Sequence, residues 1–306
     1  MAARSVIAAT DGSAGSLQAV EWAAREAMLR GEPLRIVSVP ALPPRMTPDP
    51  GHRETVAGII HAAARMALAT ATQRAAELEP GLAMTTEILS GPPVRALADA
   101  GAEASMLVVG SRGAGGFSAM ALGSVGRYLA THAPCPVVVA REETMAVHRK
   151  VVIGVRDPDE SAAALDFAFR EAALRRAGVL AVHAVSWTLP PMISVGKLTA
   201  GQRAAVDAMR DQPDTVARLD DVLALWGHKN PGVDTSWEVV HAHPGRVLAG
   251  ASARADLVVL GRPMAGITAG SVTHAVLGHA HGPVAIVPDD SQAGVRPAFT
   301  AFAPKG

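Results

Sequence analysis

The sequence is poor in cysteine and in aromatic residues. Cys135 is its one cysteine, so no disulfide can form within the chain. Aromatic residues make up only 3% of the chain although 49% is hydrophobic, so alanine and valine must fill much of the core. No apolar run approaches the ~18 residues needed to cross a bilayer, and the run before Asp11 is too short for the apolar centre of a signal peptide. Together these absences predict a cytoplasmic protein.

The chain also lacks an excess of charge, because 28 Lys and Arg residues balance 28 Asp and Glu residues. Proteins that bind nucleic acids usually carry a strong basic excess or a basic stripe. The balance therefore predicts no nucleic-acid partner, and the lack of a long apolar run predicts no membrane partner.

Histidine and cysteine give little sign of a metal or a nucleophile. His241 and His243 form one His-x-His pair, and His279 and His281 form another, a spacing that can chelate zinc. No acidic or cysteine partner stands at ligand spacing, so we expect surface histidines and no metal site. Cys135, directly before a proline, is expected to be a packed small hydrophobic residue.

The most informative feature is an internal repeat. Three segments of the first half align without gaps with three of the second half, in the same order: residues 5–30 with 150–175, 87–110 with 238–261, and 123–139 with 270–286. The offsets are 145, 151 and 147 residues, so the offset changes only between the segments. A chain of 306 residues also suits two domains of ~150 residues. We therefore predict one domain over 1–142, a second over 149–290, and a flexible tail over 291–306.

Each copy alternates short β-branched runs with longer alanine-rich segments of helical period. In the first copy the predicted strands cover 5–10, 34–39, 85–89, 106–110 and 136–140, and the predicted helices cover 14–30, 54–79, 92–103 and 124–132. Strands separated by helices form βαβ units around a buried parallel sheet, and right-handed crossovers leave few strand orders. The prediction is an α/β fold of two tandem, doubly wound, five-stranded parallel-sheet domains, each with strand order 3-2-1-4-5.

A ligand crevice is expected where this strand order reverses, between the carboxyl ends of strands one and four. Strand one ends at Asp11-Gly12-Ser13, and strand four ends at Gly110, which opens the loop GSRGAGGFSAMALGS. Glycines let backbone N–H groups come close to a ligand, and Ser124 opens a helix whose N-terminus presents N–H donors and a positive dipole end. The loop therefore predicts a cradle for an anion, and Asp11 across the crevice would suit an adenine amino group.

Simpler interpretations exist for both features. The loop could be a plain strand-to-helix turn capped by Ser124, and Asp11 could be the N-cap of the helix that begins at Ala14. Two other phosphate-binding motifs are absent from the sequence. None of the lysines precedes Ser or Thr, as a Walker A loop requires, and no GxGxxG follows the first strand.

The glycine spacing of this loop, Gly110-x2-Gly113-x9-Gly123-Ser124, resembles that of the universal stress protein family in its ATP-binding branch. Asp-Gly-Ser after the first strand and the Ala-x-Cys-Pro-Val-Val-Val segment around Cys135 add to the resemblance. It covers nearly all of residues 4–140 and, more weakly, 150–288, and the tandem arrangement resembles the two-domain members of the family.

The resemblance implies an adenine nucleotide alpha hydrolase-like fold with ATP as ligand, with or without Mg²⁺. It implies that Asp11 and the Val39 backbone contact adenine, that Val125 lies alongside, and that the phosphates are bound by Gly110, Arg112, Gly113, Gly123 and Ser124. It also implies pseudo-two-fold pairing of the copies through the last strand of each, 136–140 and 283–287, and a homodimer.

The second copy departs from this pattern. Arg156 stands opposite Asp11, and a guanidinium has donors only, although Asp157 would substitute after a one-residue slip. Met264 replaces the glycine equivalent to Gly113, and the loop is four residues shorter, which removes up to ~13 Å of reach. We predict that ATP binds in the first copy and poorly or not at all in the second.

These features favour a non-catalytic, nucleotide-dependent stress-response regulator. An ATP hydrolase, or an enzyme that transfers phosphoryl or adenylyl groups, would need a positioned base and usually a cationic clamp and a metal carboxylate. The crevice offers only Arg112 and Asp11, so we expect at most weak ATPase activity. A scaffold that binds no ligand is the remaining alternative.

Overall fold

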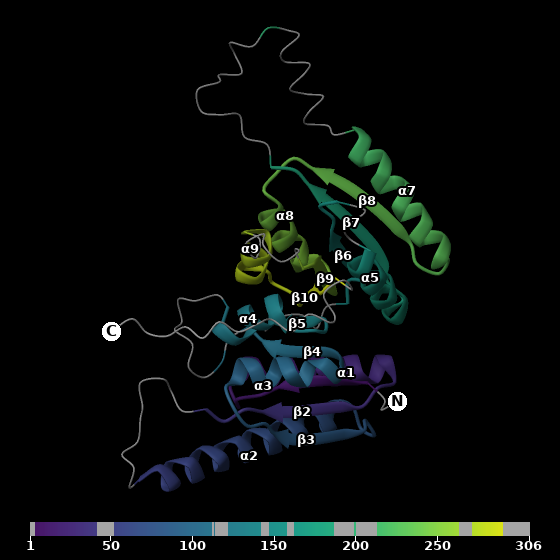
Figure 1. Ribbon diagram of the computed structural model, residues 1–306. Coiled ribbons are helices and arrows are strands. Elements are labelled where there is room, and N and C mark those ends of the chain that lie inside the picture. The colour runs from purple at the N-terminus through teal and green to yellow at the C-terminus, as the bar shows by residue number, and fades with distance from the viewer. Residues whose placement is uncertain are drawn as a thin grey trace.

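The computed structural model describes residues 4–41, 52–111, 113, 122–141, 147–157, 162–186, 199, 213–262 and 271–289 (Figure 1). The first copy contains β1 (Ser5–Ala9), α1 (Ala14–Arg30), β2 (Leu34–Ser38), α2 (Arg53–Leu78), β3 (Met84–Ile88), α3 (Pro93–Ala100), η2 (Gly101–Glu103), β4 (Ala104–Gly110), α4 (Ser124–His132) and β5 (Val137–Ala140). The second contains β6 (Lys150–Gly154), α5 (Ala162–Arg175), β7 (Gly178–Ala184), α7 (Pro213–Lys229), β8 (Thr235–Val240), α8 (Pro244–Ala251), η5 (Ser252–Arg254), β9 (Leu257–Gly261), α9 (Ser271–His279) and β10 (Val284–Val287). The tail predicted over 291–306 lies outside the described residues.

The strands form one ten-stranded sheet in the order β3-β2-β1-β4-β5-β10-β9-β6-β7-β8. Each half therefore has the order 3-2-1-4-5, and neighbours within a half are parallel. In Figure 1 the first half runs from β3 up to β5 and the second continues from β10 to β8. The predicted α/β fold with two doubly wound sheets is confirmed.

The two halves join through their last strands. β5 and β10 pair antiparallel, with Val139 opposite Val284 and Val137 opposite Ile286. The pairing expected from the resemblance is thus made within one chain. Because each of these strands lies between two neighbours, neither offers an open edge, and a homodimer would have to form through another surface.

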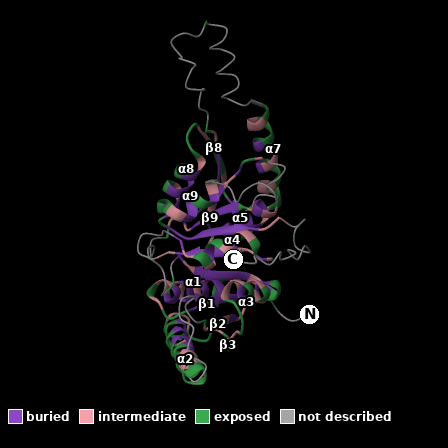
Figure 2. Ribbon diagram, turned by 60° about the vertical axis from the view of Figure 1, so that its left-hand side comes forward, coloured by how far each residue is buried: buried purple, intermediate pink, exposed green. Residues whose placement is uncertain are grey.

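Apolar side chains cover both faces of the continuous sheet. One layer packs α1, α2, α5 and α7 on the strands, and the other packs α3, α4, α8 and α9 on the opposite face. Figure 2 shows the strands buried between helices that expose their outer surfaces. Alanine fills much of the first layer, as expected from the composition: Ala19, Ala23, Ala24 and Ala27 of α1 are fully buried.

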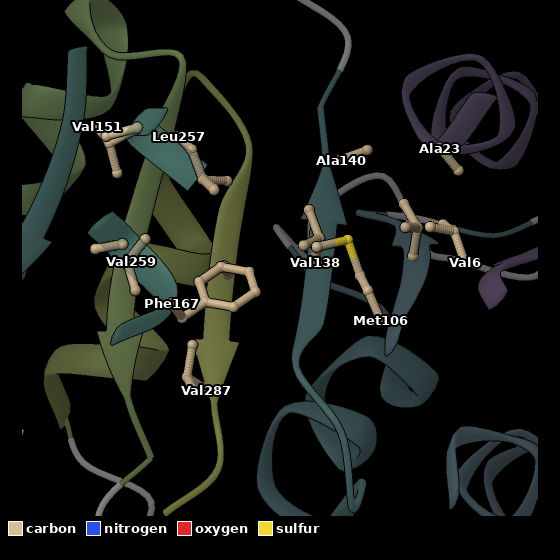
Figure 3. Close-up of a cluster of buried hydrophobic side chains, with 14 of the residues drawn as sticks. Val6, Ala23, Met106, Val138, Ala140, Val151, Phe167, Leu257, Val259 and Val287 are labelled. Atoms are coloured by element: carbon tan, nitrogen blue, oxygen red, sulfur yellow. The ribbon is translucent and has the colours of Figure 1, made fainter. Parts of the chain in front are cut away.

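The repeat is visible in the core as well as in the topology. Met106 of β4 lies opposite Val6 of β1, and Leu257 of β9 lies opposite Val151 of β6 in the second copy. All four side chains are buried in one continuous cluster, and Figure 3 shows the two sets on either side of the joined last strands. Each half therefore has an equivalent core.

The helix predicted over 92–103 is divided in the structure. α3 ends at Ala100, and a 3₁₀ turn, Gly101–Glu103, follows it. A Cβ on Gly101 would lie 3.1 Å from Sγ of Cys135, so the chain passes close to this side chain. Cys135 is buried, and burial raises the pKa of its thiol to about 12, so it packs as a neutral group.

An ionic cluster also joins the two copies. Glu26 and Arg30 of α1 face Glu171 and Arg175 of α5, and each guanidinium donates to both carboxylates. Both carboxylates are buried. The offset of 145 residues relates Glu26 to Glu171 and Arg30 to Arg175, so the cluster follows the pseudo-two-fold symmetry of the sheet.

Two aromatic rings pack on the arginines of this cluster at the α1–α5 contact. The ring of Phe167 lies 5.8 Å from Cζ of Arg30, and the ring of Trp22 lies 5.9 Å from Cζ of Arg175. In each pair the ring and the cation come from different copies. Cation–π attraction is strongest away from water, so the rings support the contact between the copies.

Candidate functional site

The carboxyl ends of β1 and β4 lie side by side at one edge of the sheet. These strands are parallel neighbours, with Ala8 opposite Val108. Gly110, at the end of β4, packs directly on the first turn of α1: a Cβ there would lie 2.6 Å from the carbonyl oxygen of Gly15 and 3.0 Å from N of Ser16. A side chain at this position would collide with backbone, so the close approach requires glycine.

Asp11 and Gly113 are brought into contact at this edge. Asp11 is exposed, and its Oδ1 accepts from N of Ser13 at 3.0 Å and from Oγ of Ser13 at 2.6 Å. A Cβ on Gly113 would lie 2.6 Å from Oδ2 of the same carboxylate. Asp11, two residues after β1, and Gly113, three residues beyond Gly110, thus meet at the point where the strand order reverses.

Asp11 is not the N-cap of α1, which corrects the simpler interpretation of this residue. Ser13 is the N-cap, and its Oγ accepts from N of Ser16 at 3.3 Å. Asp11 lies two residues earlier and holds Ser13 through the bonds to N and Oγ. Gly12, between them, has φ of 80°, which glycine adopts without strain.

α4 begins at Ser124, as predicted, but Ser124 does not cap it. The N-cap is Gly123, which has no side chain to bond the amides of the first turn. N of Gly123 donates to the carbonyl oxygen of Ser111 at 2.9 Å, so the two ends of the glycine loop are tied together. The first turn of α4 therefore receives no side-chain cap from Gly123. Arg112 and residues 114–121 lie outside the described residues.

Val39 and Val125 lie on the same face of the sheet. Val39 follows β2, Val125 is in the first turn of α4, and both are partly buried against the cluster that α3 and α4 share. They bring apolar surface to the edge of the sheet where α4 begins. Of the eight site residues predicted from the sequence, the structure describes seven and places them all at the carboxyl edge of the first-copy sheet.

The corresponding edge of the second copy is built differently. Arg156 is exposed where Asp11 stands in the first copy. Gly261, the equivalent of Gly110, packs loosely on α5: a Cβ there would meet only Cβ of Ala164, at 3.6 Å. Met264 lies outside the described residues, so its effect on the shorter loop stays a prediction.

Two residues that the sequence analysis missed support the loop after β1. Thr10 and Ser16 are buried, and their hydroxyl oxygens lie 3.1 Å apart. The repeat contained a signal for one of them, because Val155 stands at the position of Thr10 in the second copy.

Among the described residues, no group of three or more His, Cys, Asp and Glu side chains could hold a metal ion. In the same part of the chain, none of the helices combines the length and apolarity that crossing a membrane would take.

Both halves of the sheet have the same strand order, and in the first half Gly113 lies against an aspartate, which defines a tandem α/β protein. The sequence profile of the Universal stress protein family matches residues 3–141 and again residues 148–288. Universal stress protein Rv2005c of Mycobacterium tuberculosis is 31% identical over 292 residues, which cover 92% of this chain and 96% of that protein. The chain therefore belongs to the universal stress protein family, in a tandem form.

A solved structure of a universal stress protein shows the same fold. A universal stress protein from Archaeoglobus fulgidus superposes with a TM-score of 0.66 at 17% identity, over 94% of this chain and 99% of that chain. A universal stress protein in complex with cAMP matches 47% of this chain and 100% of its own, with a TM-score of 0.36 and 25% identity.

Proposed function

We propose that the first copy binds ATP and that occupancy of this site regulates a response to stress. The observation that carries the proposal is the contact between the carboxylate of Asp11 and Gly113. It brings a hydrogen-bond acceptor and a backbone that can approach a ligand closely together at the edge where the strand order reverses. Family membership supports the proposal.

Each part of ATP would meet groups suited to it. The Asp11 carboxylate would accept from the adenine amino group, and the Val39 backbone would face the ring with Val125 alongside. The phosphates would bind the amides and side chains of the glycine loop and of the first turn of α4: Gly110, Arg112, Gly113, Gly123 and Ser124. Charge-assisted hydrogen bonds of this kind are worth ~1.5–3 kcal/mol each, so several could hold a triphosphate without a lysine.

The proposed role is binding and not turnover. Rapid phosphoryl transfer needs a base that positions the nucleophile and carboxylates that hold Mg²⁺. In the proposed arrangement Asp11 is committed to adenine, and Mg²⁺, where it accompanies ATP, would be held chiefly by the phosphates. Occupancy would order the glycine loop and change the surface offered to a partner, whether a second copy of the chain or another protein.

A direct test separates the three functional alternatives. The purified full-length chain is denatured by heat, and the supernatant is assayed for adenine nucleotide. We expect nucleotide in an amount close to one per chain, and no sustained turnover when ATP is added. Steady turnover would favour an enzyme, and a chain that neither carries nor takes up nucleotide would favour a scaffold.

A further inference from the structure

Two buried hydroxyl groups hold the backbone of the loop after β1. Thr10 and Ser16 expose only 4% and 5% of their surface, and Oγ1 of Thr10 lies 3.1 Å from Oγ of Ser16. N of Gly12 donates to Oγ1 of Thr10 at 3.2 Å, and N of Asp11 donates to Oγ of Ser16 at 3.3 Å. Oγ of Ser16 donates in turn to the carbonyl oxygen of Ser13 at 2.9 Å.

The protons of this network can be assigned uniquely. A hydroxyl has one proton to donate and two lone pairs to accept with. Ser16 uses its proton on the carbonyl of Ser13, so Thr10 must donate to Ser16. Both oxygens then accept a backbone N–H, and the two hydroxyls fix three consecutive residues, from Asp11 to Ser13.

This arrangement determines where the Asp11 carboxylate lies. With its own N–H bonded to Ser16 and its Oδ1 bonded to Ser13, Asp11 is held at both its backbone and its side chain. The carboxylate is thereby kept beside Gly113. Thr10 and Ser16 are themselves buried beneath the loop.

The second copy contains the same position without the hydroxyl. Val155 replaces Thr10 and is equally buried, with 3% exposed. One backbone bond is common to both copies: N of Thr10 donates to the carbonyl oxygen of Val37 at 2.8 Å, and N of Val155 donates to the carbonyl oxygen of Val182 at 3.0 Å. A valine cannot accept from the amide two residues later, so this loop loses the bond that Thr10 makes to Gly12.

The second copy holds Val155 in another way. Nδ1 of His183 lies 2.9 Å from the carbonyl oxygen of Val155, and His183 stands where the first copy has Ser38. The valine is therefore part of a different local network and not an isolated replacement.

We propose that Thr10 and Ser16 are positioning residues for the nucleotide site, and that Val155 is one reason why the second copy binds nucleotide poorly. This inference rests on the proposed function, because the residues act through Asp11 on the nucleotide. The two copies would then differ in a buried residue beneath the site, Thr10 against Val155, as well as in the exposed residues of the site.

The test replaces one methyl-sized group at a time in the full-length chain. Thr10→Val introduces the residue of the second copy, Thr10→Ser keeps the hydroxyl, and Ser16→Ala removes the other hydroxyl. Thr72→Val is the matched control, because Oγ1 of Thr72 donates to the carbonyl of Leu68 within α2 and supports no part of the loop. The affinity for ATP is measured by calorimetry, and exchange of the Gly12 amide is followed by NMR without nucleotide.

We expect Thr10→Val and Ser16→Ala each to weaken ATP binding by about tenfold and to speed amide exchange at Gly12. Thr10→Ser and Thr72→Val should bind ATP with an affinity within about twofold of the wild type, because both variants keep the hydrogen bonds of Thr10 and Ser16. Such a result separates positioning from general stability, since Thr10→Ser also loses a buried methyl group.

Two outcomes would overturn the inference and can be told apart. If the wild type binds ATP and Thr10→Val binds it equally well, the positioning role is wrong while the proposed function stands. If the wild type itself takes up no ATP, the proposed function fails and the inference fails with it.

Discussion

Arg30 of α1 donates a hydrogen bond to Glu171 of α5, so a cation of the first copy is neutralised by a carboxylate of the second. Arg175 makes the equivalent bond to Glu26 in the opposite direction. The copies are thus held together by a symmetric set of buried charges as well as by the pairing of their last strands. Because α1 also begins at the loop that contains Asp11, one helix connects the candidate site to the contact between the copies.

The stability of the fold should fall as the pH rises from about 5 to about 8. Burial, followed by the charge of Glu26, raises the pKa of Glu171 to about 7 from an ordinary value of 4.5. Between these values the folded state holds a proton that the unfolded chain has released, and the stability it contributes is lost as the pH rises through 7. Burial also acts to raise the pKa of Glu26, but the opposing effect of Arg175 and Arg30 is larger, so the pKa lies below its ordinary value of 4.5. The contribution of Glu26 to stability therefore changes only below about pH 4.5.

Urea unfolding at several pH values measures this effect. We expect a loss on the order of 2 kcal/mol across the window, and Glu171→Gln should remove that part of the dependence. Glu21→Gln on α1 is the control, because Glu21 pairs with Arg74 at a partly exposed position. A Glu171→Gln variant with the same pH dependence as the wild type would show that the carboxylate stays ionised throughout.

Removing one cation from the cluster should be far more costly than removing an exposed one. Arg175→Met would leave two buried carboxylates with one guanidinium, and loss of one partner from a buried ion pair typically costs ~3–5 kcal/mol. Arg74→Met breaks a pair in which Arg74 is 47% exposed, so its cost should stay below about 1 kcal/mol. Equal losses in the free energy of unfolding would contradict the structural role of the cluster.

Gly110, at the end of β4, should tolerate substitution by alanine much less well than Gly261, its counterpart in the second copy. In Gly110→Ala the new Cβ would lie 2.6 Å from the backbone oxygen of Gly15, whereas in Gly261→Ala it would lie 3.6 Å from Cβ of Ala164. We expect a loss of about 1–3 kcal/mol for the first, from forced backbone movement, and within about 0.5 kcal/mol for the second. Thermal unfolding of the two variants checks this, and similar melting temperatures would refute it.

Much of the fold was predictable because its signals are local. The strands and helices follow from runs of β-branched residues and from helical periodicity, and α1 and α4 occupy the predicted residues. The handedness of crossovers leaves only a few strand orders, and the order that the sheet adopts is one of them. The antiparallel joining of β5 and β10 could not come from periodicity, because it depends on contacts between residues far apart in the chain.

The site was predictable in outline but not in its supporting bonds. Asp11 and Ser13 are both good capping residues, and sequence alone does not decide which one caps α1. The structure resolves this because Asp11 bonds Ser13, which in turn bonds Ser16. The ionic cluster was hidden in the same way: the matching of Glu26 with Glu171 showed the repeat, but not that the two carboxylates meet.

Replacing Gly113 should weaken nucleotide binding without unfolding the chain. In Gly113→Ala the new Cβ would lie 2.6 Å from Oδ2 of Asp11, so the carboxylate must move away. Gly250→Ala in α8 is the matched control, because a Cβ there would meet nothing within 4 Å. We expect ATP affinity to fall by at least about tenfold in the first variant, with little change in the control. Unchanged affinity in Gly113→Ala would place the binding groups elsewhere.

Calorimetric titration of the full-length wild-type chain with ATP tests the central claim most directly, because it gives the number of sites and the affinity together. The account predicts one tight site per chain, in the first copy, and the affinity of that site should fall in Gly113→Ala. Two equally tight sites, or no binding, would contradict it.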